Sequence, residues 1–210
     1  MDKKYSVLIV EDQALPRRLL EMMVTSSPNY TLTASIDCAA MTDLYIVSRD
    51  VDLVLMDVIT RDGASGLDAA EKIKRLNSRV KIIIVTSMPE HSYISRAKNI
   101  GVEGFWYKES AETEILRIMD RVMSGERVYP DAPPIIDIGN IKSSEFTARE
   151  LEVLRELLEG DTDREIGEKL NLSADTVHSH IKNMLGKTGF KSRTKLAVAV
   201  RESGLIINDY

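Results

Sequence analysis

Polar side chains stand directly after several short apolar segments in the first half of the chain. These side chains belong to Glu11, Asp12, Asp57, Thr86 and Lys108. If the apolar segments are neighbouring parallel strands, their carboxyl ends meet at one edge of a sheet, which is where such sheets bind their ligands. We therefore expect the five side chains to come together in one site.

The chemistry of this set points to a cation and a phosphoryl group. Three carboxylates brought together repel one another and raise one another's pKa unless a cation lies among them. Mg²⁺ suits a site of this kind, because it binds a few carboxylates and keeps several waters. The ammonium of Lys108 adds a positive charge and Thr86 adds a hydroxyl. The combination favours transfer of a phosphoryl group to a carboxylate, with the cations neutralising its charge.

The spacing of apolar residues up to about residue 124 predicts strands that alternate with helices. The strands are continuous apolar runs, which are typical of a parallel sheet covered by helices on both faces. We expect an α/β doubly wound, five-stranded parallel sheet of the flavodoxin-like type, with a loop over 59–65. The expected strands cover 6–10, 31–36, 51–56, 80–85 and 102–107. The expected helices begin near Leu15 and then cover 39–48, 66–77, 89–99 and 110–124.

The remainder of the chain changes character twice. Residues 125–143 are rich in proline and glycine and poor in periodicity, which is typical of a linker. From Glu145 onward the pattern is helical only, with helices expected at 148–159, 163–170, 174–187 and 193–203. The predicted organisation is therefore an α/β domain at 1–124, a linker at 125–143 and an all-α four-helix domain at 144–210.

Charge is strongly segregated within the helical domain. Residues 145–175 carry ten acidic and four basic side chains, whereas residues 176–201 carry six basic and no acidic ones. Residues 163–187 are expected to form helix, turn and helix, and a second helix of about 14 residues is ~21 Å long, which fits the major groove of B-DNA. The overall net charge of −5 argues against a chain that binds nucleic acid along its whole length.

The second of these helices offers candidate DNA contacts on its outward face. Its expected core stripe consists of Val177, Ile181, Met184 and Leu185. This arrangement leaves His178, Ser179 and Lys182 facing outward near the first half of the helix, where recognition helices meet base edges. The side chains expected to contact phosphate are those of Lys187, Lys191, Arg193 and Lys195.

The cluster at the strand ends resembles the receiver domain of two-component response regulators, over residues 5–124. The resemblance implies that Asp57 accepts the phosphoryl group and that Lys108 pairs with it. Thr86 and Phe105 would be the switch hydroxyl and the switch aromatic residue. The implied ligands of Mg²⁺ are Glu11, Asp12, Asp57 and the main-chain carbonyl of Ile59.

The loop after Asp57 departs from the usual receiver pattern. Thr60 and Arg61 stand where a Met-Pro pair is usual, and Ser65 replaces an aspartate. Gly66 lies one residue later than expected. These departures bear on the shape of the loop and on the affinity for metal.

The helical domain resembles the LuxR-type helix-turn-helix domain. The matching positions include Thr147, Glu150, Gly160, Glu165, Ile166, Leu170, Leu172, Ser173, Thr176, Val177, His178 and His180. Gly167 stands where alanine is usual, and Thr188-Gly-Phe190 replaces the usual Leu-x-Val. Taken with the receiver resemblance, the whole chain is similar to response regulators of the NarL/FixJ type.

This resemblance implies a phosphorylation-regulated, DNA-binding transcription regulator and not an enzyme. The implied partners are a sensor histidine kinase, an operator with two half-sites, RNA polymerase and, after phosphorylation, a second copy of the chain in a homodimer. The implied cofactor is Mg²⁺. A single cysteine, and the lack of an apolar stretch long enough for a signal peptide or a membrane span, predict a cytoplasmic protein with no membrane partner.

Other protein classes share parts of this pattern. A flavodoxin-like nucleotide binder holds phosphate with glycines, hydroxyls or amides after the first strand, where Glu11 and Asp12 would repel it. A phosphatase with an aspartate nucleophile usually has a second aspartate two residues later, where Ile59 stands and cannot transfer a proton. A further alternative is a phosphorylation-independent regulator whose helical domain binds DNA or a protein partner constitutively.

Overall fold

The computed structural model describes residues 4–108 and 112–206. The chain folds into two compact units, one formed by residues up to 132 except 88–90, the other by residues from 133 onward with 88–90. Each unit has a hydrophobic core of its own. Within the ranges described, every helix is too short or too polar to cross a membrane.

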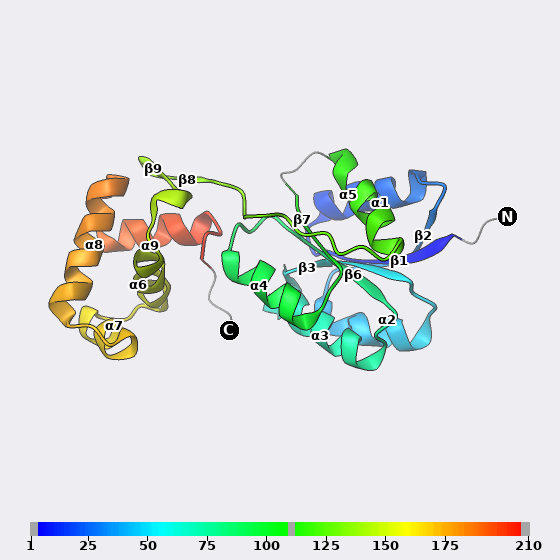
Figure 1. The fold of residues 1–210 in the computed structure, drawn as a ribbon, viewed down its shortest axis with the longest axis horizontal. Coiled ribbons are helices and arrows are strands. Elements are labelled where there is room, and N and C mark those ends of the chain that lie inside the picture. Colours follow the sequence, from blue (N-terminus) through cyan, green and yellow to red (C-terminus); the bar gives the residue numbers. More distant parts are fainter. Residues whose placement is uncertain (1–3, 109–111, 207–210) are drawn as a thin grey trace. The chain divides into compact units, whose positions relative to one another are not determined.

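Five parallel strands form the central sheet of the first unit (Figure 1). They are β1 (Tyr5–Val10), β2 (Tyr30–Ile36), β3 (Leu53–Asp57), β6 (Lys81–Thr86) and β7 (Gly104–Tyr107). Their order is β2-β1-β3-β6-β7, so the direction of winding reverses between β1 and β3. This confirms the predicted doubly wound sheet and puts its topological switch point at the ends of the two strands that precede Glu11 and Asp57.

Helices cover both faces of this sheet. The helices α1 (Ala14–Ser26) and α5 (Glu112–Met123) lie on one face (Figure 1). The helices α2 (Thr42–Ser48), α3 (Gly66–Leu76) and α4 (His91–Ile100) lie on the other. A one-turn 3-10 helix at Ala39–Met41 precedes α2, where the sequence predicted a continuous helix over 39–48. Because both faces are covered, every residue of β3 and β7 is buried, as the continuous apolar runs predicted.

The strand β3 begins later than predicted. It starts at Leu53 instead of residue 51, and it includes Asp57 as its last residue. The carboxylate of Asp52 accepts hydrogen bonds from the backbone N–H and the hydroxyl of Ser6, both at 2.8 Å. These polar contacts hold Asp52 outside the regular strand.

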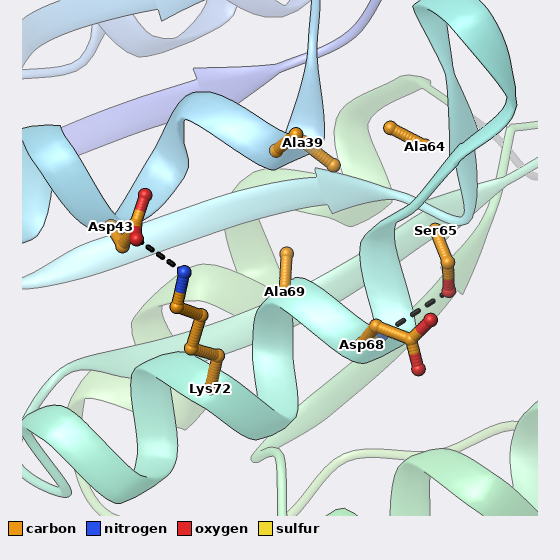
Figure 2. Close-up of a pocket in the computed structure, with 8 residues that line it drawn as sticks. Ala39, Asp43, Ala64, Ser65, Asp68, Ala69 and Lys72 are labelled. Atoms are coloured by element: carbon orange, nitrogen blue, oxygen red, sulfur yellow. Dashed lines mark hydrogen bonds and ion pairs between the residues drawn. The ribbon is translucent and has the colours of Figure 1, made fainter.

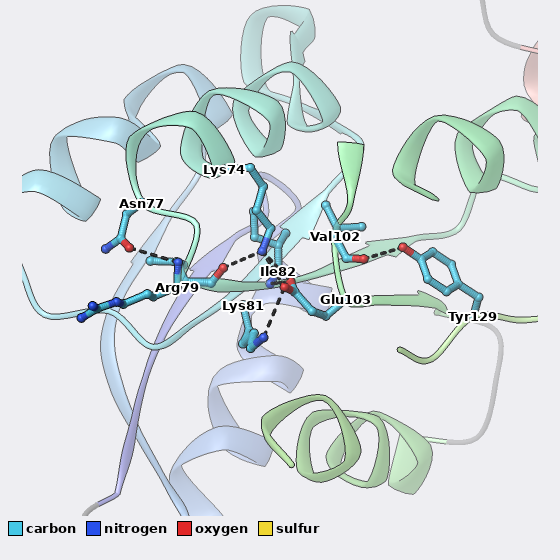
Figure 3. A network of polar contacts seen from close by, with 9 residues as sticks. Lys74, Asn77, Arg79, Lys81, Ile82, Val102, Glu103 and Tyr129 are labelled. Atoms are coloured by element: carbon cyan, nitrogen blue, oxygen red, sulfur yellow. Dashed lines mark hydrogen bonds and ion pairs between the residues drawn. The ribbon is translucent and has the colours of Figure 1, made fainter. Parts of the chain in front are cut away.

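The start of β7 is anchored by an ion-pair cluster around Glu103 (Figure 3). Both carboxylate oxygens of Glu103 lie 2.7 Å from Nζ of Lys74, which belongs to α3, and Nζ of Lys81 lies 3.4 Å from one of them. The backbone N–H of Ile82 donates to the same carboxylate at 3.0 Å. The Glu103 side chain is only 10% exposed. Its contacts with Lys74, Lys81 and Ile82 connect α3, β6 and the start of β7 at the amino end of the sheet.

The segment over 59–65, predicted as a loop, is a small antiparallel hairpin. It consists of β4 (Ile59–Thr60), a 3-10 turn over Arg61–Gly63, and β5 (Ala64–Ser65). The turn requires positive φ angles at Asp62 and Gly63, of 61° and 72°. Aspartate and glycine are among the residues that adopt this left-handed conformation most readily, which explains why a tight turn forms here.

Residues 125–143, predicted as a linker, contain ordered pairing near both ends. Val128 pairs with β7: its N–H donates to the carbonyl of Glu103 and its carbonyl accepts from the N–H of Phe105, both at 2.9 Å. A second hairpin, formed by β8 (Asp137–Ile138) and β9 (Ile141–Lys142), contributes Ile138 and Ile141 to the core of the second unit. These apolar residues are too few and too widely spaced to produce a periodic pattern.

Within its described residues, the second unit contains four short α-helices. They are α6 (Ala148–Glu159), α7 (Asp163–Leu170), α8 (Ala174–Thr188) and α9 (Arg193–Glu202). The first two begin where predicted, because Thr147 and Thr162 each accept a hydrogen bond from a backbone N–H three residues later in a complete capping box.

The buried face of α8 differs from the predicted stripe at one position. Val177, Ile181 and Met184 are buried as expected, but the fourth buried residue is Thr188. Leu185 is only partly buried. The Thr188 hydroxyl donates to the carbonyl of Met184 at 2.7 Å, which satisfies this polar group inside the core.

Candidate functional site

The predicted acidic cluster forms at the switch point between β1 and β3. Carboxylate oxygens of Glu11, Asp12 and Asp57 lie within 4.8 Å of one another. The ammonium of Lys108, directly after β7, lies 2.5 Å from Oε2 of Glu11 and 2.8 Å from Oδ2 of Asp57. Glu11 is fully buried and Asp57 is 5% exposed. The structure therefore brings four of the predicted residues into one charged cluster.

Burial dominates the electrostatics of this cluster. Burial, with a contribution from the charge of Glu11, raises the pKa of Asp57 to about 7, while Lys108 and the N–H of Val58 act in the opposite direction. Burial also disfavours the charged form of Lys108, but Asp57 and Glu11 outweigh it and hold the pKa of Lys108 above its usual range. Lys108 is therefore the cation that neutralises the buried carboxylates.

A close backbone approach fixes the orientation of Asp57. Its Oδ1 accepts a hydrogen bond from the N–H of Val58 at 2.7 Å, and the N–H of Gly66 donates to the Val58 carbonyl at 2.7 Å. A Cβ atom at residue 66 would lie 1.8 Å from the carbonyl oxygen of Asp57, so only glycine fits. The hairpin over 59–65 thus accommodates the one-residue displacement of Gly66 and brings this glycine against the backbone of Asp57.

Two residues of the unusual loop hold this hairpin in place. The buried hydroxyl of Thr60 accepts from the N–H of Ala39 at 2.8 Å and donates to the carbonyl of Ala64 at 3.2 Å. The guanidinium of Arg61 lies 2.8 Å from the carboxylate of Asp37, which follows β2. In the sequence, Thr60 and Arg61 are only departures from the usual pattern, and their anchoring contacts involve residues more than twenty positions away.

The two predicted switch residues lie in the interior of the first unit. Thr86 ends β6 and is fully buried, and its carbonyl accepts from the N–H of Lys108 at 2.9 Å. Phe105 is 1% exposed and its ring centroid lies 5.1 Å from that of Tyr107. Since the N–H of Phe105 donates to Val128, this strand is bonded directly to the segment that follows α5.

The donor set of the cluster fits a hard divalent cation. Three carboxylates supply oxygen ligands close enough to share one ion, as Mg²⁺ prefers. Ile59, whose main-chain carbonyl is the predicted further ligand, is the first residue of β4 and lies two positions after Asp57. A cation bound here would compete with Lys108 for the same carboxylates.

A cavity of about 270 Å³ lies apart from this cluster, beside the hairpin and between α2 and α3 (Figure 2). Its lining residues are Ala39, Ala40, Asp43, Ala64, Ser65, Asp68, Ala69 and Lys72. Four of them are alanines, and an ion pair between Lys72 and Asp43 bounds one side. None of the predicted site residues lines this cavity.

The helix α8 exposes the residues predicted to contact bases. His178, Ser179 and Lys182 are all exposed. The hydroxyl of Ser179 donates to the carbonyl of Asp175 at 2.9 Å, and Nδ1 of His178 lies 3.2 Å from a carboxylate oxygen of Asp163. In the part of the chain that the structure describes, no ion pair involves Lys182 or the exposed Lys191.

Two of the side chains predicted to contact phosphate form ion pairs within the second unit. Nζ of Lys187 lies 2.8 Å from Oε1 of Glu150, and NH1 of Arg193 lies 2.6 Å from Oδ1 of Asp163. Burial raises the pKa of Glu150, but hydrogen bonds from Lys187 and Thr147 outweigh it and leave the pKa below its usual range. In the sequence, Glu150 is a position that matches the LuxR-type domain, and nothing indicated Lys187 as its partner or Arg193 as the partner of Asp163.

Comparison with known proteins agrees with both units. Residues 7–120 match the response regulator receiver domain, and residues 144–200 match the bacterial regulatory proteins of the luxR family. The Fimbriae Z protein of Escherichia coli K12 is 29% identical over 204 residues, which cover 92% of this chain and 95% of that protein. The transcriptional regulatory protein DesR of Bacillus subtilis is 29% identical over 199 residues, which cover 95% and 98%.

Solved structures share the fold. RcsB from Salmonella enterica serovar Typhimurium, bound to a promoter in the presence of the phosphomimetic BeF3, superimposes with a TM-score of 0.65 at 19% identity. The superposition covers 94% of this chain and 98% of RcsB.

A doubly wound parallel sheet with an acidic cluster at its switch point, followed by a helical regulatory unit, defines a response regulator. The chain belongs to this family, and specifically to the NarL/FixJ type, with a receiver domain followed by a LuxR-type domain. Its members are transcription regulators and not enzymes.

Proposed function

We propose that this response regulator is switched by phosphorylation of Asp57 by a partner histidine kinase, with Mg²⁺ as cofactor. The observation that carries the proposal is the cluster of Glu11, Asp12 and Asp57 with Lys108 in contact with two of the three carboxylates. Burial of a single reactive carboxylate beside a lysine and two further acids suits an acyl phosphate, which needs positive charge around it.

In the proposed reaction, a carboxylate oxygen of Asp57 attacks the phosphorus of the donor. The new oxygen–phosphorus bond forms as the bond from phosphorus to the donor histidine nitrogen breaks, and that nitrogen keeps the electron pair. Lys108 would shift from the Asp57 carboxylate to the phosphoryl oxygens, and the Thr86 hydroxyl would donate to one of them. Mg²⁺, when bound by Glu11, Asp12, Asp57 and the carbonyl of Ile59, neutralises charge on the transferring group.

The proposed output is binding of an operator by α8. His178, Ser179 and Lys182 would face base edges, and Lys187, Lys191 and Arg193 would face phosphates. The ion pairs of Lys187 and Arg193 give these two cations a competing partner inside the unit. One recognition helix covers only a few base pairs, so two copies on two half-sites supply useful specificity. RNA polymerase is the proposed further partner, and the cytoplasm the proposed compartment.

Phosphorylation is tested with a small-molecule phosphodonor and intact mass measurement. The wild-type chain should gain one phosphoryl group in the presence of Mg²⁺ and none in its absence. Asp57→Asn, which keeps the size of the side chain, should gain none in either condition. Asp12→Asn is expected to weaken the Mg²⁺ dependence without abolishing the reaction at high Mg²⁺. A phosphorylated Asp57→Asn species would show that another residue is the acceptor.

Operator binding is tested by footprinting on genomic fragments before and after phosphorylation. Protection should appear as two adjacent half-sites and should require less of the phosphorylated protein. Equal protection by both forms would favour the constitutive regulator instead. No protected DNA in either form would favour a helical unit that binds a protein partner.

A further inference from the structure

Asp163 lies where three helices of the second unit meet. It is the first residue of α7, and its carboxylate contacts one side chain from α8 and one from α9. Oδ2 lies 3.2 Å from Nδ1 of His178, and Oδ1 lies 2.6 Å from NH1 of Arg193. Arg193 is held a second time, because its NH2 donates to the carbonyl of Asp161 at 2.7 Å. One carboxylate therefore holds two of the side chains proposed to contact DNA.

We infer that Asp163 limits the affinity of the LuxR-type domain for DNA by competing with DNA for two side chains, Arg193 at a phosphate and His178 at a base edge. The inference rests on the proposed function, because it places α8 and the start of α9 against DNA. In the free protein the carboxylate neutralises the guanidinium of Arg193 and contacts Nδ1 of His178, so DNA must displace it before either side chain can bind DNA. Asp163 is thus a regulator of the interface and not one of its contacts.

Exposure explains why this ion pair is exchangeable. The side chains of Arg193 and Asp163 are 39% and 23% exposed, so water can solvate each of them once the pair has separated. The pair between Lys187 and Glu150 is different, because the Glu150 side chain is only 5% exposed. Removing Lys187 would leave a buried carboxylate without its cation, which is far more costly. We therefore expect DNA to recruit Arg193 more readily than Lys187.

Competition of this kind acts most strongly on binding without sequence preference. Such binding depends almost entirely on phosphate neutralisation, so its affinity falls steeply with salt and follows the number of available cations. A carboxylate within a Debye length of the DNA, about 10 Å at 0.1 M salt, also repels the phosphates directly. Asp163 thus reduces the number of available cations and also adds repulsion. Both effects lower affinity for random DNA more than affinity for an operator, whose bases are also recognised.

The test compares the full-length wild-type protein with two charge-matched variants on a random-sequence duplex. Asp163→Asn removes the charge and keeps an oxygen that can accept from Arg193. Glu168→Gln, on the same helix, removes the same charge from a side chain that is 65% exposed and, among the residues described, forms its ion pair with Arg164. Affinity is measured by fluorescence anisotropy over a range of salt concentrations, and thermal unfolding is recorded for each variant.

Asp163→Asn should bind the random duplex several-fold more tightly, and the slope of log affinity against log salt should steepen by up to about one unit. Glu168→Gln should stay within about twofold of wild type with an unchanged slope. Adding Arg193→Gln to Asp163→Asn should remove most of the gain.

The inference is overturned if folded Asp163→Asn binds as weakly as wild type or more weakly, or if Glu168→Gln gains as much. If wild type and all variants fail to bind any duplex at low salt, DNA binding itself is refuted, and the inference with it. A gain with Asp163→Asn on random DNA, together with failed footprinting of genomic fragments, would refute sequence-specific regulation alone.

Discussion

Asp57 illustrates at the residue scale how burial sets the state of a reactive group. The carboxyl group is surrounded by the ends of β1, β3 and β7, and neither Lys108 nor the Val58 N–H fully offsets its loss of hydration. Its pKa of about 7 means that the group is partly protonated near neutral pH. A cation held by Glu11, Asp12 and Asp57 would favour the charged form of the Asp57 carboxylate, which is the form that the proposed phosphoryl transfer requires.

The raised pKa of Asp57 predicts a stability difference between wild type and Asp57→Asn in magnesium-free buffer. Between the ordinary value of 3.8 and about 7, the folded protein keeps a proton that the unfolded chain has lost. Rising pH across this window therefore lowers the free energy of unfolding of wild type, by up to about 1.4 kcal/mol per pH unit. Asp57→Asn lacks this contribution. Urea unfolding of both proteins across the window measures the difference, and parallel pH profiles would contradict the raised pKa.

The apolar side chain of Ile59 leads us to predict a long lifetime for the phosphoryl group on Asp57. It lies two residues after Asp57, and its side chain can neither hold nor activate a water molecule in line with the acyl phosphate. Met88, two residues after Thr86, has the same apolar character. Ile59→Asn should speed loss of the phosphoryl group about tenfold or more, since an amide there can hydrogen-bond a water molecule and orient it in line with the acyl phosphate. Ile59→Val should have little effect. Equal decay of all three proteins would show that the hairpin, and not the side chain, controls access of water.

At the scale of elements, the buried carboxylate of Glu103 joins several elements at the amino end of the sheet. Glu103 connects α3, β6 and β7, and its backbone carbonyl also accepts from Val128 after α5. Burial lowers the pKa of Lys74 more than the neighbouring Glu103 raises it. The pair therefore fixes the relative position of three elements without a large net gain in stability.

Lys74→Met is expected to destabilise the receiver domain by about 3–5 kcal/mol, because Glu103 would be left buried with its main cation removed. Adding Glu103→Met should recover most of this loss. Arg75→Met is the control, since the Arg75 side chain is 77% exposed and its pair with Glu71 should contribute less than about 1 kcal/mol. Urea unfolding compares the four proteins. A double variant as unstable as Lys74→Met would mean that Glu103 has a further structural function.

Substitutions on α8 and just after it are predicted to impair DNA binding in two different ways. Lys182 lies on the exposed face of the helix, and Lys191 lies beyond its end. Lys182→Ala should relax sequence preference, with a loss of about 1–3 kcal/mol on the operator only. Lys191→Ala should weaken binding to all DNA and reduce the salt slope by about one. Competition binding on operator and random duplexes separates the two, and identical losses would show that α8 does not lie in the groove as proposed.

At the scale of the whole molecule, two units with separate cores must act together. The receiver domain holds the cluster around Asp57, and the LuxR-type domain holds α8. Dimerisation is a physical route between them that needs no fixed arrangement of the two units, because joining two receivers raises the effective concentration of two helical domains on adjacent half-sites.

Phosphorylation should therefore convert the protein from monomer to dimer and tighten binding to a two-half-site operator. A gain of about 10²-fold or more is expected when both half-sites can be engaged. Light scattering with and without a phosphoryl mimic measures the first effect, and titration of operators with one or two half-sites measures the second. A monomer that binds both operators equally well in either state would contradict this mechanism.

The sequence by itself determined the five strands of the central sheet, the main helices of both units and the order of these elements. Continuous apolar runs can be buried only in a parallel sheet covered on both faces, and capping boxes mark helix starts through contacts only three residues apart. For the same reason it predicted that Glu11, Asp12, Asp57 and Lys108 would meet, because residues at the carboxyl ends of adjacent parallel strands must converge.

Only the tertiary structure decided which of the predicted side chains form hydrogen bonds or ion pairs within the protein. The anchoring of the hairpin by Thr60, the pairing of Val128 with β7, and the ion pairs of Lys187 and Arg193 join residues about 20 to 40 positions apart. Such contacts depend on how helices and loops pack against one another, and local periodicity carries no information about that packing. The sequence could therefore locate the charges of both sites, whereas their partners and burial followed from the fold.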